Sequence, residues 1–247
     1  MLASSQVTMA SPFTVKDRTD NRTSSLPRFT AARPASAAIC ADSSVQQRRL
    51  EQYIHDVFAR AYQADVRHFL PLLVGIRDAA GDYIAAAGLQ PAAMHALYLE
   101  NYLDRPVDKV LSDRMQQDID RRQIIEAGNL AVTNRGGARH LITTLLAYLY
   151  HAGYQWAVFT AVPVLVNNFR KLGLPLTTLA AADPHRLGAD ADSWGRYYDY
   201  GPTVVAGHIP TGFHLLQQRE RMLDDPDRER SLHSFIYRTN HPTSPRS

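Results

Sequence analysis

Cysteine is almost missing from this sequence, which holds only Cys40 among its 247 residues. A single cysteine cannot form an internal disulfide, so the fold does not depend on cross-links, and this usage is typical of a reducing compartment. Cys40 lies in a segment rich in Ser, Thr, Ala and Pro, without neighbours that would stabilise a thiolate. We therefore assign it no catalytic role.

Long hydrophobic runs are missing as well. No apolar stretch approaches the roughly 20 residues that a membrane-spanning helix needs. The N-terminus lacks the cationic start and apolar core of a secretory signal. The sequence therefore predicts a cytoplasmic protein without an integral membrane segment, and it leaves peripheral membrane contact open.

Several catalytic motifs have no counterpart here. The sequence contains no Walker loop, no GxGxxG after the first strand, no GxSxG elbow and no HExxH. His55 and His68 have no partner at metal-ligand spacing, so we predict no metal site.

Clustered charge is also missing. The 27 basic and 24 acidic residues are interspersed, and the net charge is only +3. Nucleic-acid binding would favour a gathered basic face, so we expect no nucleic-acid partner. The weak basic excess is compatible with an anionic small ligand. The hydrophobic content of 45% indicates a globular protein with one substantial core.

The domain organisation follows from shifts in composition. Residues 1–43 are poor in large apolar side chains and are predicted to form a disordered tail. Residues 44–216 carry the periodic apolar patterns of a folded domain, and residues 217–247 form a charged extension with a frayed or mobile end.

Within the folded part, helical and strand patterns alternate. Four amphipathic or apolar helical stretches and six strands are expected. The helices cover 45–65, 92–120 with a break at Pro106, about 140–153 and 163–173, and the strands cover 69–76, 83–89, 122–132, 156–162, 176–182 and 203–209. The first two strands form an antiparallel hairpin, whereas strands 122–132 and 156–162 are parallel neighbours because a helix connects them.

The strand at 122–132 is unusual because polar residues interrupt its apolar pattern. Glu126, Gly128 and Asn129 stand among Ile, Leu, Ala and Val. A glycine inside a strand indicates a bulge or a close backbone approach, which leaves peptide groups free to face a ligand. We place this bulge at Gly128.

The segment that follows favours an anion. Residues 133–139 read TNRGGAR and lead into a helix that opens at about His140. Backbone N–H groups and the positive end of a helix dipole would point into the same space as the strand. Strand, bulge and helix start therefore predict the floor of a site for an anionic ligand.

Seven short blocks between about Leu50 and Gly212 form a recognisable set: Phe69–Leu73, Ala86–Leu89, Leu99–Leu103, Glu126–Ala131, Trp156–Thr160, Ala182–Pro184 and Trp194–Tyr198. Taken together, these blocks resemble the bacterial thermostable hemolysin family. The core of that family is similar to the GNAT-type N-acyltransferase fold and to the acyl-homoserine-lactone synthases.

The resemblance implies an α/β (α+β) fold with a GNAT-like mixed, mostly antiparallel central sheet flanked by helices and splayed at the central strand. The splay would fall between Gly128 and the strand from Trp156, with an acyl thioester lying in the V. A freed N–H at Gly128 or Asn129 would stabilise the oxyanion. Glu126 would position or deprotonate an amine. The alternative is a structural salt bridge from Glu126 to an arginine such as Arg121, Arg122 or Arg139.

The donor would be acyl-CoA or an acyl-phosphopantetheine arm, with an acyl carrier protein as a candidate partner and no tightly bound cofactor. The implied donor-binding residues are Ala131, Val132, Arg135, Gly136, Gly137, Ala138, Arg139, Asn167 and Phe169. Arg135–Arg139 matches the family's pyrophosphate motif only loosely. Phe169 stands where such enzymes often hold a tyrosine acid, so Tyr197 or Tyr198 is a candidate replacement, although a thiolate also leaves without an acid. Asn167 and Asn168 either hold substrate or cap a helix.

The acceptor would lie among aromatic residues. We expect it to contact Tyr102, Phe159, Thr160, Trp194 and Tyr197, with the aromatic loop as a lid, although such a loop equally suits packing on the sheet edge. The apolar stretch from Ala92 to Leu111 would house the acyl chain, unless it is plain core.

Three functions remain open at this point. The first is an N-acyltransferase that moves an acyl group, fatty acyl included, from a thioester to the amine of a small molecule such as an amino acid. The second is a membrane-active hemolysin-like protein, and the third is a non-catalytic fold that binds an acyl group or a lipid. The acceptor, the acyl length and the oligomeric state do not follow from the sequence.

Overall fold

A computed structural model describes residues 36–40, 45–133 and 135–223 of the chain. Its centre is a seven-stranded sheet with the strand order β1-β2-β3-β4-β5-β7-β6. The strands are β1 (Ser36–Cys40), β2 (Leu72–Arg77), β3 (Tyr83–Pro91), β4 (Ile124–Val132), β5 (Trp156–Ala161), β6 (Thr177–Ala181) and β7 (Thr203–His208).

The sheet is mixed but mostly antiparallel, as expected from the sequence. Only β4 and β5 pair in parallel, and every other neighbouring pair is antiparallel. The parallel pair is joined through a helix because parallel neighbours need a crossover. The predicted hairpin of β2 and β3 and the predicted parallel pair are therefore both confirmed.

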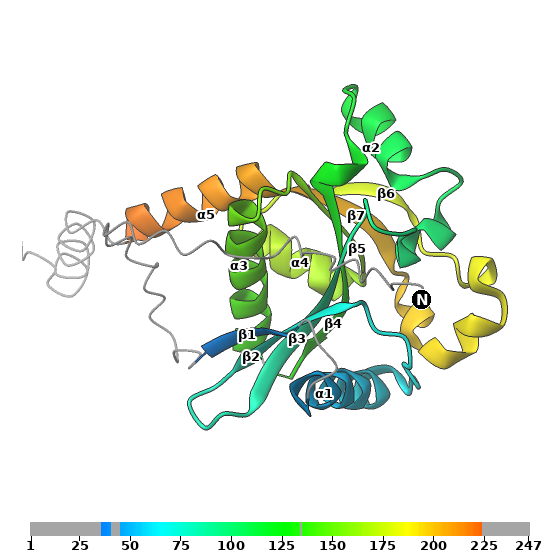
Figure 1. Cartoon of the computed structure of the whole chain (residues 1–247), viewed down its shortest axis with the longest axis vertical. Helices are drawn as coiled ribbons and strands as arrows, with labels where there is room; N and C mark the ends of the chain where they lie inside the picture. The colour runs from blue at the N-terminus through cyan, green and yellow to red at the C-terminus, as the bar shows by residue number, and fades with distance from the viewer. Residues whose placement is uncertain (1–35, 41–44, 134, 224–247) are drawn as a thin grey trace, which may run out of the picture.

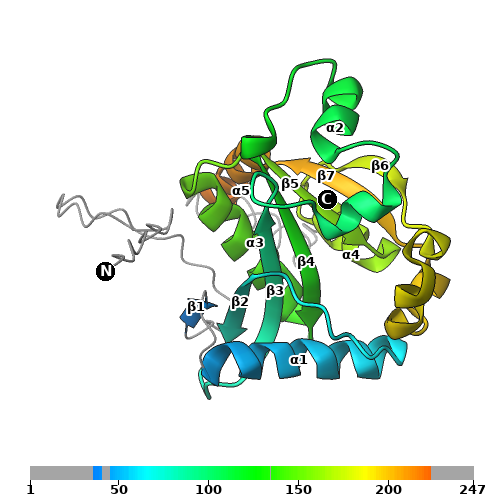
Figure 2. The same ribbon diagram turned by 45° about the vertical axis from the view of Figure 1, so that its right-hand side comes forward.

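Helices cover both faces of the sheet. Figure 1 shows α3, α4 and α5 on one side, and Figure 2 shows α1 crossing beneath β2, β3 and β4 on the other. The helices are α1 (Val45–Tyr62), α2 (Val107–Met115), α3 (Arg135–His151), α4 (Pro163–Lys171) and α5 (Ile209–Leu223), with short 3₁₀ helices η1 (Tyr98–Tyr102), η2 (Arg121–Gln123), η3 (Pro184–Trp194) and η4 (Tyr197–Tyr200). None of the helices in the described ranges is long and apolar enough to cross a membrane.

Simple patterns explain two of these helices. In α1, Leu50, Ile54 and Phe58 recur every four residues and are buried. They therefore form the stripe with which an amphipathic helix packs on a sheet. In α4, Pro163 occupies the first turn, where its missing N–H is not needed, and Gly173 with a φ of +75° follows the helix.

The central strands separate soon after they pair. β4 and β5 are in register only at Ile124–Trp156, Ile125–Ala157 and Glu126–Val158, although both strands continue. Beyond that point β4 keeps β3 as its neighbour and β5 keeps β7. The predicted splay is thus confirmed, and it begins directly after Glu126.

A β-bulge lies in β4 where the strand leaves β5. Gly128 pairs with Gly88 and Ala131 pairs with Ala86, so β4 holds one residue more than β3 in this interval. Asn129 takes the left-handed conformation with a φ of +50°. The left-handed residue of the bulge is therefore Asn129, and the expectation that the bulge lies at Gly128 is corrected. Asparagine can take this position because, like glycine, it tolerates the left-handed conformation.

The bulge reverses the alternation of side chains along β4. Before it, Ile125 and Ala127 pack in the core layer beneath α3. After it, Leu130 and Val132 face that same layer, while Ala131 packs with α1. The odd residues point toward α3 before the bulge, and the even residues do so after it.

Four expectations about element bounds are corrected. Ser36–Cys40 is a strand paired with β2, not part of a disordered tail. α3 begins at Arg135 instead of His140, because its glycines are accommodated in the first turn. Residues 92–97 are not helical, and α5 continues through Leu223, past the expected boundary at 217. The rest of the two predicted terminal segments lies outside the described residues.

Substitution of Asn129 tests the bulge. Its side chain accepts from the Leu70 N–H at 2.9 Å and donates to the His68 carbonyl at 3.0 Å. Asn129→Gly removes both bonds but suits the backbone, and we expect it to lower the free energy of unfolding by about 1–3 kcal/mol. Asn129→Ala adds about 1–2 kcal/mol of left-handed strain. Urea unfolding of both variants measures this difference, and equal losses would show that the strain is absent.

Candidate active site

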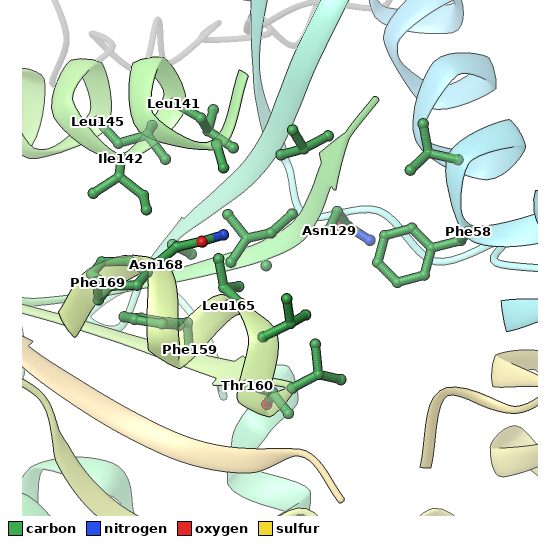
Figure 3. A pocket seen from close by; sticks show the side chains of 18 of the residues that line it. Phe58, Asn129, Leu141, Ile142, Leu145, Phe159, Thr160, Leu165, Asn168 and Phe169 are labelled. Carbon is green, nitrogen blue, oxygen red and sulfur yellow. The ribbon is translucent and has the colours of Figure 1, made fainter. Parts of the chain in front are cut away.

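A cavity of about 1020 Å³ opens where β4 and β5 separate. It passes between the strands and reaches both helical layers. Figure 3 shows residues of α3 and α4 facing each other on one side of the cavity, and Asn129 of β4 near Phe58 of α1 on the other. The cavity therefore has an α3/α4 half and a half on the α1 side of the sheet.

Most residues that line the α3/α4 half are apolar, and Arg139, Asn168 and Lys171 are the exceptions. The apolar residues are Leu141, Ile142, Leu145 and Leu146 of α3, Val164, Leu165 and Phe169 of α4, Leu172 directly after α4, and Phe159 of β5. Phe159 and Phe169 stack with ring centroids 4.9 Å apart. Space of this character suits an alkyl chain, because its burial removes apolar surface from water.

The chain-binding region expected between Ala92 and Leu111 is not found there. Leu99, Leu103, Val107 and Leu111 pack in the core against strand residues such as Trp156 and Val158. They are buried by the sheet itself, so the stretch is plain core. Two residues of this stretch, Tyr98 and Tyr102, line the cavity.

The half on the α1 side is walled by rings, and we call it the aromatic chamber. It is lined by Phe58, Tyr62, Tyr98, Tyr102, Trp194 and Tyr197. The Trp194 indole N–H donates to the Tyr98 hydroxyl at 2.8 Å, and the Tyr197 hydroxyl donates to the Thr160 carbonyl at 3.4 Å. The aromatic loop thus packs against α1 and η1 and closes one side of the cavity.

Glu126 forms the boundary between the two halves. It is 3% exposed, and it lines the cavity at the last residue of β4 that pairs with β5. Its Oε2 accepts from the Tyr98 N–H at 2.8 Å, and its Oε1 accepts from the Leu99 N–H at 3.1 Å. Two backbone donors at the start of η1 therefore fix the plane of the carboxyl group.

Burial dominates the proton affinity of Glu126. Desolvation raises its pKa to about 7, although the two backbone hydrogen bonds act in the opposite direction, and the charge of Glu100 raises it further. A carboxyl group with a pKa near neutrality exchanges protons readily at physiological pH. Glu126 is therefore suited to accept a proton inside the cavity.

The alternative of a structural salt bridge is not supported. Arg121 binds Glu100 with a 2.8 Å contact and Asp108 with a 3.2 Å contact, and Arg122 pairs with Asp120. Among the described residues Glu126 forms no ion pair, with Arg139 or any other cation. The Glu126 carboxylate is therefore not neutralised by an ion pair and can interact with a ligand in the cavity.

The sequence did not indicate that Arg121 pairs with Glu100, although this pair holds the site together. Glu100 accepts from the backbone N–H of Leu97 and of Val107, each at 2.8 Å. Arg121 donates to Glu100 and to the Ala92 carbonyl, the latter at 2.7 Å. These bonds fix η1, whose N–H groups hold Glu126. Glu100 lies three residues after Leu97, a spacing typical of a helix-start carboxylate and the only signal in the sequence.

The free edge of β4 offers backbone donors beside Glu126. From Ala127 onward β4 has no partner on its β5 side, so peptide groups there point into the gap. Gly128 and Asn129 both line the cavity. The Asn129 side chain is engaged with residues 68 and 70, so any donor role at this residue falls to the backbone.

The predicted donor-binding residues are only partly brought together. Val132, Ala138, Arg139 and Phe169 line the cavity, and Asn168 does so in place of Asn167. Asn167 bonds Arg170, while Ala131 is buried in the core layer with α1, and Gly137 lies in the first turn of α3 outside the lining. Arg135 and Gly136 begin α3, and their side chains lie outside the described part.

Tyr198 lies one residue behind the chamber wall. Its hydroxyl contacts the Tyr102 hydroxyl at 2.6 Å, and only Tyr102 reaches the cavity. Burial raises the pKa of Tyr102, Tyr197 and Tyr198 well above the usual range. These phenols therefore stay protonated and are able to donate. In the part of the chain that is described, no cluster of His, Cys, Asp and Glu suits a metal ion.

Comparisons with known proteins agree with this fold. The family model described as thermostable hemolysin matches residues 40–213. TofI in a ternary complex with an inhibitor and MTA is 14% identical, with 73% of this chain and 96% of TofI covered and a TM-score of 0.51. Apo TofI is also 14% identical, with 74% of this chain and 96% of TofI covered and a TM-score of 0.52. FeeM, an N-acyl amino acid synthase from uncultured soil microbes, is 12% identical, with 72% of this chain and 92% of FeeM covered and a TM-score of 0.48.

At these identities the likeness establishes the fold, and the two TofI structures carry that assignment. The fold is GNAT-like, as the sequence predicted. The search of curated proteins returned no match.

The raised pKa of Glu126 predicts a pH-dependent stability. Between its ordinary pKa near 4.5 and about 7, the folded chain keeps this proton while the unfolded chain loses it. The free energy of unfolding should therefore fall with rising pH on account of this group, by about 2–3 kcal/mol between pH 5 and pH 8. Glu126→Gln does not titrate and should gain that amount relative to the parent. Urea unfolding at both pH values measures it, and a pH-independent difference would contradict the raised pKa.

Proposed function

The chain belongs to the thermostable hemolysin family, and from the geometry of its cavity we propose that it is an N-acyltransferase. A thioester donor passes its acyl group to the amine of a small molecule. The observation that carries this proposal is the buried Glu126 at the point where β4 and β5 part, between an apolar half and an aromatic half. We further propose that residues 44–216 form the catalytic domain and act in the cytoplasm.

The reaction needs one nucleophilic attack and one proton transfer. The amine nitrogen attacks the thioester carbonyl carbon, the C–N bond forms, and the C–S bond breaks to release a thiolate. The proton lost by the amine moves to the Glu126 carboxylate and then to the thiolate, so an amide and a thiol are the products. With both oxygens held by the N–H groups of Tyr98 and Leu99, the carboxylate still has lone pairs for this proton.

The unpaired edge of β4 would stabilise the negative charge that develops on the carbonyl oxygen. Backbone N–H groups around Gly128 are held rigidly by the pairing of β4 with β3. Donors fixed in advance do not reorganise when charge develops, which is why such sites lower the barrier strongly. The buried Tyr102, whose hydroxyl contacts that of Tyr198, is available as a further donor to the leaving group.

The thioester would enter from the side of α3. Ala138 and Arg139, near the start of α3, line the cavity, and the N–H groups and positive dipole of a helix start would attract the phosphates of the donor. An acyl-CoA or the phosphopantetheine arm of a carrier protein would both fit this entry. The acyl chain would then lie between α3 and α4, in the apolar half.

Thiol release tests the proposal directly. The purified full-length chain is incubated with acyl-CoA or acyl carrier protein thioesters and a panel of small amines, and free thiol and amide product are measured. Release that depends on the amine supports the proposal. Binding of thioester without turnover would select a non-catalytic acyl-binding role instead, and lysis of lipid vesicles with no substrate present would select a membrane-active protein.

Glu126→Gln should remove turnover. We expect kcat to fall about 100-fold or more, the usual effect of losing a positioned base. Asp113→Asn is the matched control, because Asp113 is 63% exposed on α2 and only pairs with Arg105. It should keep parental kinetics. Full activity of the Glu126→Gln variant in steady-state thiol release would rule out a role for this carboxylate.

Leu145→Trp should shorten the preferred acyl chain. Leu145 is 7% exposed and lines the apolar half, so a larger ring there occupies the space for the far end of a chain. We expect kcat/KM to drop about tenfold or more for a dodecanoyl thioester, with little change for an acetyl thioester, because each buried methylene contributes about 1–3 kcal/mol of discrimination. Leu145→Met, which conserves volume, is the control. Equal losses with both donors would place the chain elsewhere.

A further inference from the structure

The aromatic chamber has a chemistry that selects its ligand. We infer that it accepts a small amine that carries no carboxylate, and this inference rests on the proposed function for its role as acceptor site. It narrows the acceptor from amines in general, amino acids included, to amines whose body is neutral and apolar or aromatic.

The chamber has one charged group in its lining as described, and it is an anion. Glu126 supplies that charge. Arg139 and Lys171 also line the cavity, but they belong to α3 and α4, which lie across the sheet from α1. The remaining nitrogen base is His68, an exposed residue whose ring lies 5.8 Å from that of Tyr98. A ligand carboxylate in the chamber would thus meet neither an arginine nor a lysine.

The rings themselves favour a cation. Trp194 lies 5.7 Å from Tyr98 and 5.9 Å from Phe58, and Tyr62 lies 5.2 Å from Tyr197, measured between ring centroids. Aromatic faces attract an ammonium group through their negative quadrupole and repel an anion. A cationic amine would therefore bind between these faces and the Glu126 carboxylate.

Several donors that could hold a carboxylate are already used within the protein. The Trp194 N–H binds the Tyr98 hydroxyl, and the Tyr197 hydroxyl binds the Thr160 carbonyl. The hydroxyl groups of Tyr102 and Tyr198 form a hydrogen bond with each other, which uses one of their two hydrogens. A carboxylate placed among these rings would give up its hydration and gain no hydrogen bond from the donors that are already engaged.

An α-amino acid combines both problems. Its carboxylate is attached to the same carbon as its amine, so an amine positioned at Glu126 places a second carboxylate beside the first. The two like charges would repel in a poorly solvated space, where such interactions are stronger than in water. Removing the ligand carboxylate removes the repulsion and the desolvation cost together.

Matched amines test this inference independently of turnover. Binding of tyramine and tyrosine, and of phenethylamine and phenylalanine, is measured by calorimetry on the full-length chain at pH 8. We expect each carboxylate-free amine to bind at least about tenfold more tightly than its amino acid, since an unpaired charge is costly to bury. The neutral 2-phenylethanol should bind more weakly than phenethylamine. Glu126→Gln and Trp194→Leu should each weaken phenethylamine binding, whereas Asp113→Asn should not.

The outcomes separate the two proposals. Amino acids that bind as tightly as their amines, or an absence of binding by every amine, would overturn the inference. Turnover with amino acids but not with the matched amines would overturn it while leaving the acyltransferase proposal intact. Tight, selective amine binding without thiol release from any thioester would support the chamber's specificity and defeat the acyltransferase proposal.

Discussion

The site depends on the early end of the hydrogen-bonded ladder between β4 and β5. After three parallel pairs the strands diverge, with the bulge at Asn129 bending β4 and β5 staying with β7. The same divergence exposes backbone donors on β4, opens the cavity to both helical layers and leaves Glu126 in its lining at the point of divergence. Without it, ordinary strand pairing would fill the space and satisfy those donors.

The Glu126 carboxyl group is held by a chain of interactions that begins at residues outside the cavity lining. Arg121 binds Glu100, Glu100 fixes the start of η1, and η1 presents the N–H groups that orient Glu126. Removing one member of this partly buried network leaves a charge unpaired, which is destabilising. Stability and the geometry of the site are therefore coupled through the same residues, and neither can be altered separately at Glu100.

Much of this could be predicted from the sequence because it follows from local pattern. Short apolar runs bounded by a polar turn predict β2 and β3, and Glu126 is conspicuous as a carboxylate inside an apolar strand. Periodicity shows which face of an element is apolar, but not which layer covers it. The apolar wall of the cavity was therefore expected at Ala92–Leu111, whereas residues of α3 and α4 line it. The Glu100–Arg121 pair joins residues 21 apart without any periodic signal, and the bulge could not be assigned between two neighbouring residues that both tolerate positive φ.

Because the alternation of side chains reverses at Asn129, the number of residues in β4 must stay constant for each side chain to face its layer. Ile125 and Ala127 before the bulge and Leu130 and Val132 after it share one layer only because a single extra residue lies between them. A deletion of one residue here would rotate the second half of β4, turning its apolar side chains toward α1 and a small alanine toward α3. A substitution at this point changes one side chain, whereas an insertion or deletion would change which helical layer every later side chain of β4 faces.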